Sequence, residues 1–109
     1  KTSRLIKEKY SDIQIRTTFQ SRFGPREWPK PYTDKTLEDL PKEGAKNVLV
    51  ICPGFASDCV ETLEEISIQG KESFLNHGGK NFDLIPCLND NTDHIQLFET
   101  LIKRYLVQK

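Results

Sequence analysis

The sequence contains no methionine, one tryptophan and three cysteines among its 109 residues. Because it starts at Lys1 without an initiator methionine, and its first ten residues have the pattern of a helix end, we expect a fragment of a longer chain. No run approaches the roughly 20 apolar residues that a transmembrane helix requires, and no signal-peptide core is visible. The sequence itself therefore carries no predicted membrane-spanning segment.

The three cysteines, Cys52, Cys59 and Cys87, are odd in number and lack the C-x-x-C spacing of many metal sites. This pattern argues against a disulfide framework and against a zinc or iron–sulfur site, and reduced thiols favour a cytoplasmic location. Basic and acidic residues both number 16. The resulting zero net charge gives no attraction to nucleic acid or to a membrane surface, so we expect no nucleic-acid partner.

Strand and helix patterns alternate along the chain, which is long enough for one domain at most. The predicted elements are a helix end at residues 1–10, strands at 13–19, 47–52 and 82–87, and helices at about 33–40, 58–76 and from about 92 onward. Strands separated by helices predict right-handed crossovers and a parallel sheet. We therefore expect an α/β fold in which helices cover both faces of a parallel sheet of about three strands.

Apolar residues at helical spacing predict the buried face of each helix. The expected buried residues are Leu37 and Leu40 in the first, Leu63, Ile66 and Phe74 with Val60 beside them in the second, and Ile95, Phe98, Ile102 and Tyr105 in the third. Thr33 or Asp34 is expected to cap the first helix, and residues 77–79 to end the second.

Residues 47–65 form the stretch around which the chain is organised. A buried strand ends at Pro53 and Gly54, and Asp58, Glu61 and Glu65 then recur at i, i+3 and i+7, which places three carboxylates on one helical face. Asp58 as N-cap with Glu61 at N3 would give a capping box, with the acids simply solvated. Since these acids have no basic partner before Lys71, they can also form a site that attracts cations.

The segment 20–34 is a long loop that contains three aromatic residues, Phe23, Trp28 and Tyr32. Long loops without secondary structure are usually functional, although these aromatics can also simply pin the loop to the body. The isolated His77 and His94 have the positions of structural residues near helix ends.

Three stretches resemble the ferrochelatase family: QSRFGPREWPKPYTDKTLEDL, CPGFASDCVETLEEI and IPCLNDNTDHIQLFETLI. Together they cover nearly all the chain, in the family's order. The resemblance implies a chelatase-type α/β fold of two similar domains, of which residues 1–109 are the C-terminal part of the second. It also implies insertion of ferrous iron into protoporphyrin IX, the last step of haem synthesis, by a lyase that forms nitrogen–metal bonds.

The resemblance assigns roles to individual residues. Glu61 matches the family's glutamate that binds the metal or takes pyrrole protons, Asp58 and Glu65 match acids on a polar path, and Trp28 matches a loop tryptophan beside the macrocycle. The chemistry suits a carboxylate at the ring centre, because inserting a divalent metal removes two N–H protons. Cys59 stands where some relatives have histidine.

The sequence departs from the family pattern at two places. The catalytic histidine belongs to an upstream Ser-x-His-Gly-type motif that does not occur here, so the missing N-terminal part of the chain is an expected partner. The C-terminal cysteine cluster of some members is also absent, and we expect neither a [2Fe–2S] cluster nor an organic cofactor. The alternative is a tetrapyrrole- or metal-binding module, cobalt-chelatase-like or periplasmic-binding-like, without turnover.

Overall fold

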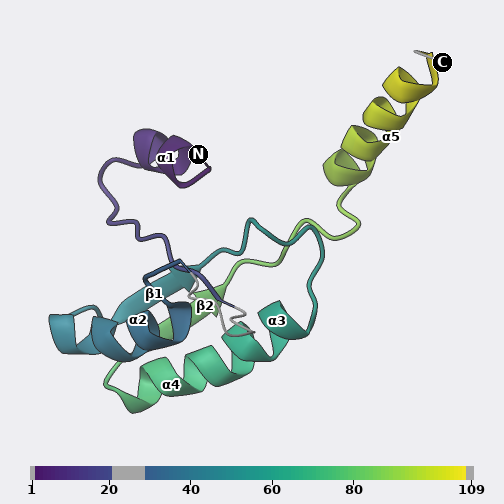
Figure 1. Cartoon of the computed structure of the whole chain (residues 1–109). Helices are drawn as coiled ribbons and strands as arrows, with labels where there is room; N and C mark the ends of the chain where they lie inside the picture. The colour runs from purple at the N-terminus through teal and green to yellow at the C-terminus, as the bar shows by residue number, and fades with distance from the viewer. Residues whose placement is uncertain (1, 21–28, 108–109) are drawn as a thin grey trace.

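A computed structural model of the chain describes residues 2–20 and 29–107 (Figure 1). The elements in chain order are α1 (Thr2–Lys9), α2 (Thr33–Asp39), the 3-10 helix η1 (Leu40–Glu43), β1 (Asn47–Val50), α3 (Val60–Leu63), the π-helical η2 (Glu65–Gly70), α4 (Lys71–Asn76), β2 (Asn81–Leu84) and α5 (Thr92–Val107). The segments α3, η2 and α4 follow one another without a break and form the crossover between the two strands.

The sheet consists of β1 and β2, which pair in parallel from Asn47 opposite Asn81 to Val50 opposite Leu84. A further bond from the Ile85 N–H to the Val50 carbonyl, 2.8 Å long, extends the pairing past the end of β2. The strands alternate in burial, because successive side chains of a strand point to opposite faces. The predicted parallel α/β fold is thereby confirmed for these two strands.

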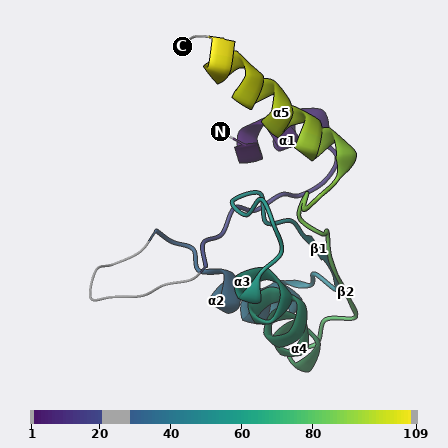
Figure 2. The ribbon, with the colours of Figure 1, turned by 90° about the vertical axis from the view of Figure 1, so that its right-hand side faces the viewer.

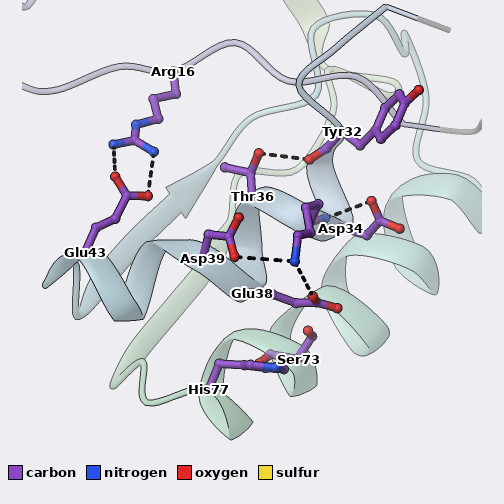
Figure 3. A network of polar contacts seen from close by, with 10 residues as sticks. Arg16, Tyr32, Asp34, Thr36, Glu38, Asp39, Glu43, Ser73 and His77 are labelled. Atoms are coloured by element: carbon purple, nitrogen blue, oxygen red, sulfur yellow. Dashed lines mark hydrogen bonds and ion pairs between the residues drawn. The ribbon is translucent and has the colours of Figure 1, made fainter.

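The third predicted strand, at residues 13–19, is wrong. Among the described residues this segment makes a single bridge, between Phe19 and Tyr32, and residues 13–18 pair with no other strand there. Arg16 instead binds Glu43 through two hydrogen bonds of 3.0 and 2.8 Å, as Figure 3 shows. The sequence of this segment does alternate between apolar and polar residues, but a strand also needs a neighbouring strand for its backbone hydrogen bonds. Ile13, expected on the buried face, is 57% exposed.

The core lies between the sheet and the helices on one of its faces (Figure 2). Its buried apolar residues are Leu37, Cys52, Ile66, Phe74 and Phe82. On the opposite face of β1, Leu49 is 63% exposed. Helices on both faces, which the alternation of elements predicted, are therefore not seen among the described residues.

The predicted start and buried face of the second helix need correction. It begins at Val60 rather than Asp58, and Val60 and Leu63 are exposed, whereas Ile66 and Phe74 are buried as expected. The reason is the π-helical η2, where the Gln69 N–H bonds the Glu64 carbonyl five residues earlier. One π turn rotates the residues before it relative to those after it, so a single 3.6-residue period does not describe the whole run.

The ends of the helices follow local chemistry. Gly78, at φ +108°, ends the run in the left-handed conformation that suits glycine, as predicted for residues 77–79. The N-cap of α2 is Tyr32 and makes no side-chain cap bond, so the predicted cap at Thr33 or Asp34 is wrong by one residue or two. Leu37 is buried in α2 as predicted.

Helix α5 extends away from the sheet and the other helices (Figures 1 and 2). Its span and its apolar stripe match the prediction, but the stripe residues Ile95, Phe98, Ile102 and Tyr105 are all exposed. None of the helices in the described part of the chain is long and apolar enough to cross a membrane.

Candidate functional site at the strand ends

The loops that follow the two strands meet at the carboxyl edge of the sheet. Residues 51–59 connect β1 to α3, and residues 85–91 connect β2 to α5. Since parallel strands end at the same edge, the topology brings Asp58 of the first loop against Asn89 of the second. Ligands of open parallel α/β sheets bind at this edge, so the candidate site is the place where Asp58 meets Asn89, together with the first turn of α3 that follows.

Asp58 accepts hydrogen bonds on both carboxylate oxygens. Oδ1 accepts from the Thr62 hydroxyl at 2.9 Å, and Oδ2 accepts from Asn89 Nδ2 at 2.9 Å and from the Cys87 N–H at 3.2 Å. The Asn89 bond and the bonds from Cys87 and Thr62 lower the pKa of this carboxyl below its usual value, against the opposing effect of burial. Asp58 is therefore an ionised acceptor whose oxygens face protein donors.

The sequence predicted Asp58 as the N-cap of α3, and this prediction is wrong. Cys59 holds that position, with an extended backbone at φ −150° and ψ −171°, and Asp58 precedes it. The three acids at i, i+3 and i+7 consequently do not share one helical face, because Asp58 is outside the helix. The physical reason is that Asp58 has better partners across the chain than the helix N-terminus offers.

Thr62 connects the Asp58 carboxylate to the helix start and is fully buried. Its hydroxyl oxygen accepts from the Cys59 N–H at 2.9 Å while its proton goes to Asp58 Oδ1. Thr62 is thus the N3 residue of the capping box, whose side chain accepts from the N-cap backbone N–H. The sequence had predicted Glu61 for this role.

Glu61 lies in the first turn of α3 and is half-buried. Its backbone carbonyl accepts a 2.9 Å bond from Gln20 Nε2, which fixes the turn to the start of the long loop. Bonds from the Cys59 thiol and from its own backbone lower the pKa of the Glu61 carboxyl. The carboxylate is therefore ionised near neutral pH, when it can coordinate a cation or accept a proton.

Glu65 lies one turn further on, in η2. It borders a cavity of about 360 Å³ between α2 and the helical run, together with Thr33, Asp34, Gln69 and others. Asp58 borders a different cavity of about 280 Å³, beside Lys71 and Asp83. In the described residues the two acids predicted for a shared path thus line separate hollows.

The long loop is described only at its two ends. Trp28, predicted to contact the porphyrin, and Phe23 lie outside the described residues. At the ends, the Phe19 N–H bonds the Pro31 carbonyl and the Thr33 N–H bonds the Phe19 carbonyl, each at 2.9 Å. Both ends of the loop are therefore joined to each other at the base of α2.

The three cysteines are free thiols. Burial raises the pKa of Cys52, and burial together with the Asp58 carboxylate raises the pKa of Cys87 to about 11. Both are therefore protonated near neutral pH, whereas a metal ligand is a thiolate. Within the described residues, no three His, Cys, Asp or Glu side chains are grouped so as to hold a metal ion.

The two histidines have the structural contacts that their positions predicted. His77 Nδ1 lies 2.7 Å from the Ser73 carbonyl at the end of α4 (Figure 3). His94 is buried, lies 2.7 Å from the Asn89 carbonyl and packs on the Phe98 ring at 4.4 Å. Gln20, Thr62 and Asn89 are within the quoted motifs but had no predicted role. The bonds of Gln20 to Glu61 and of Asn89 to Asp58 span long sequence distances, so only the fold reveals them.

Comparison with known proteins decides the family, because the sequence matches the ferrochelatase family over residues 1–106. The chain belongs to the ferrochelatase family. It is 51% identical over 107 residues to the ferrochelatase of Brucella anthropi and 49% identical over 108 residues to those of Brucella ovis and Brucella canis. These matches cover 96–97% of this chain and 31% of each relative, so the chain spans about a third of their length. No solved structure matches the chain.

Proposed function

We propose that the chain is part of an enzyme that inserts ferrous iron into protoporphyrin IX to form protohaem, the last step of haem biosynthesis. Such an enzyme is a lyase that forms nitrogen–metal bonds. Membership of the ferrochelatase family supports this reaction. The observation that carries the assignment of a site is the position of Glu61, in the first helical turn after the carboxyl end of β1.

The reaction replaces two pyrrole N–H protons with one Fe²⁺ ion, so the site needs a group that takes protons or holds the incoming ion. Glu61 is our candidate for that catalytic and metal-binding role, since its carboxylate is ionised and its backbone is held by Gln20. Glu65 is our candidate for the polar path. Asp58 borders the same strand end, but its oxygens already accept bonds from protein donors.

The remaining features of the site are proposed from the resemblance. Trp28 would lie against the macrocycle, and residues 1–109 would form the C-terminal part of the second of two similar domains. We propose that no organic cofactor or [2Fe–2S] cluster takes part and that the enzyme is cytoplasmic; these remain predictions.

We propose that the 109-residue segment does not catalyse the reaction alone. It lacks the Ser-x-His-Gly-type motif that supplies the histidine opposite Glu61, and catalytic groups that act as a unit are strongly non-additive. The partners of the segment are thus protoporphyrin IX, Fe²⁺ and the rest of the ferrochelatase chain.

The test is an anaerobic assay of protohaem formation from Fe²⁺ and protoporphyrin IX. A full-length ferrochelatase that carries this segment should turn over, and the purified segment should stay at the uncatalysed background rate. Porphyrin binding by the full-length protein, seen as quenched porphyrin fluorescence, without any metal insertion would instead establish the alternative, a tetrapyrrole-binding module.

A further inference from the structure

We propose that Asn89 is a positioning residue: by clamping Asp58 it fixes the start of α3, where Glu61 lies, and keeps the Asp58 carboxylate out of the chemistry. The inference rests on the proposed function of Glu61 and adds a role for two residues of the site. It assigns Asp58 to the support of the site, in place of the polar path that the resemblance implies.

Asn89 makes four hydrogen bonds, of which three join the two strand-end loops and the fourth reaches His94 in α5. Its backbone N–H donates to the Ala56 carbonyl at 2.9 Å, and its backbone carbonyl lies 2.7 Å from His94 Nδ1. Its side chain pairs with Asp58 in both directions: Oδ1 accepts from the Asp58 N–H at 2.8 Å, and Nδ2 donates to Asp58 Oδ2 at 2.9 Å. Since a carbonyl only accepts, His94 carries a proton on Nδ1.

The clamp continues from Asp58 into the first turn of α3. Asp58 Oδ1 holds the Thr62 hydroxyl, and that hydroxyl holds the Cys59 N–H at the N-cap. Glu61 lies between Cys59 and Thr62 in sequence, so both ends of its short segment are fixed by this network. The position of the Glu61 carboxylate therefore depends on a residue 28 positions away, on the loop after the other strand.

Asparagine suits this position for a backbone reason as well. Asn89 has φ +49°, in the left-handed region that asparagine and glycine tolerate better than other residues. Asn89→Gly therefore keeps the permitted backbone and removes only the side-chain half of the clamp. Asn91, in the same loop, offers a matched control, because its Oδ1 accepts from the Asp93 N–H at the start of α5.

The positioning role predicts a loss in turnover rather than in binding. Small displacements of a catalytic group can cost about 10²-fold in rate. In a full-length ferrochelatase that carries this segment, Asn89→Gly should lower kcat for iron insertion at least about 10-fold, with the porphyrin Kd unchanged. Asn91→Gly should keep kcat within about 2-fold of the unsubstituted enzyme, as expected for an exposed side chain whose bond is to the start of α5 and not to Asp58.

A second readout is independent of activity. Amide hydrogen exchange at Asp58 and Cys87 should be faster in Asn89→Gly, because Asp58 donates to Asn89 and Cys87 donates to the carboxylate that Asn89 holds. Asn89→Asp keeps the acceptor for the Asp58 N–H but replaces the Nδ2 donor to the Asp58 carboxylate with an oxygen. It should therefore lower kcat and speed exchange at Cys87, which donates to that carboxylate, and it serves if the glycine variant does not fold. In a double-mutant cycle, Asp58→Asn and Asn89→Gly should be non-additive in kcat, since one acts through the other.

Unchanged exchange at both amides would show that the clamp is absent and would overturn the proposal. Faster exchange with unchanged kcat would leave Asn89 a purely structural residue, which also overturns it. If the unsubstituted full-length enzyme shows no turnover, the proposed function fails and the positioning role fails with it, while the exchange data still report whether the clamp itself exists.

Discussion

The helical run from α3 to α4 and the helix α5 carry similar amphipathic patterns, but apolar residues are buried in the run and exposed in α5. In the run, Phe74 is completely buried and Ile66 nearly so, both against the sheet. In α5, Tyr105 is 60% exposed and no apolar residue of the stripe is buried. A 3.6-residue apolar period therefore predicts a helix with an apolar face, but whether that face is buried depends on the rest of the fold.

The largest effect that would test this contrast is expected at Phe74. Phe74→Ala should lower the free energy of unfolding of the 109-residue chain by about 3–5 kcal/mol, because it removes a buried ring and leaves a cavity between α4 and β2. Urea denaturation followed by circular dichroism measures the change. A loss below about 1 kcal/mol would mean that the core described here does not stabilise the chain.

A smaller effect is expected where the backbone approaches the same ring. A Cβ at Gly79 would overlap the Phe74 ring, so Gly79→Ala should cost about 1–3 kcal/mol through overpacking. At Gly54 a Cβ would meet nothing within 4 Å, which makes Gly54→Ala the matched control with little expected change. Equal melting temperatures for the two variants would contradict the packing of Phe74.

The stability of the chain should depend on pH through Asp58, at the start of the helical run. The pKa of Asp58 is lowered in the folded chain by Asn89, Cys87 and Thr62, so ionisation of Asp58 favours folding. This contribution is present above the unfolded pKa of about 3.9 and is lost as the pH falls through the lower folded value. Melting temperatures measured from pH 6 to pH 2 should fall less steeply at the acid end in Asp58→Asn; parallel curves would contradict the clamp.

The smallest effect is expected on α5. Ile102→Ala, at a side chain 59% exposed, should change the free energy of unfolding of the 109-residue chain by no more than about 0.5 kcal/mol. Urea denaturation of this variant beside Phe74→Ala gives the comparison directly. A loss of 2 kcal/mol or more would show that the α5 stripe is buried in solution and that the two regions are alike.

Much of the fold could be predicted because it depends on local pattern. The strand at residues 47–50, the helix end at Gly78 and the span of α5 follow from apolar runs, a glycine and helical spacing. The strand predicted at 13–19 failed because pairing is non-local, and in the described part of the chain its single bridge is to Tyr32. The buried face at Val60 and Leu63 failed because the π turn changes the period within one helix.

The sequence predicted only those parts of the candidate site that depend on local pattern. Glu61 lies where the strand-to-helix pattern placed it, but Asp58 was given the role of N-cap that Cys59 fills. A local rule could not anticipate that Asp58 would pair with Asn89, 31 residues away, on the loop of another strand. Its carboxylate therefore serves the contact between two loops rather than the helix end.

We propose that Glu61 carries the chemistry while Asp58 supports the site. This division of roles is tested by kcat for iron insertion by Glu61→Gln in a full-length ferrochelatase that carries this segment. Glutamine keeps the size of the side chain and removes the charge that a base or an Fe²⁺ ligand requires. We expect kcat to fall at least about 10²-fold while the unfolding transition is unchanged, with a milder loss in Glu65→Gln. Near-normal turnover in Glu61→Gln, or a loss that arises only because the variant does not fold, would contradict the account.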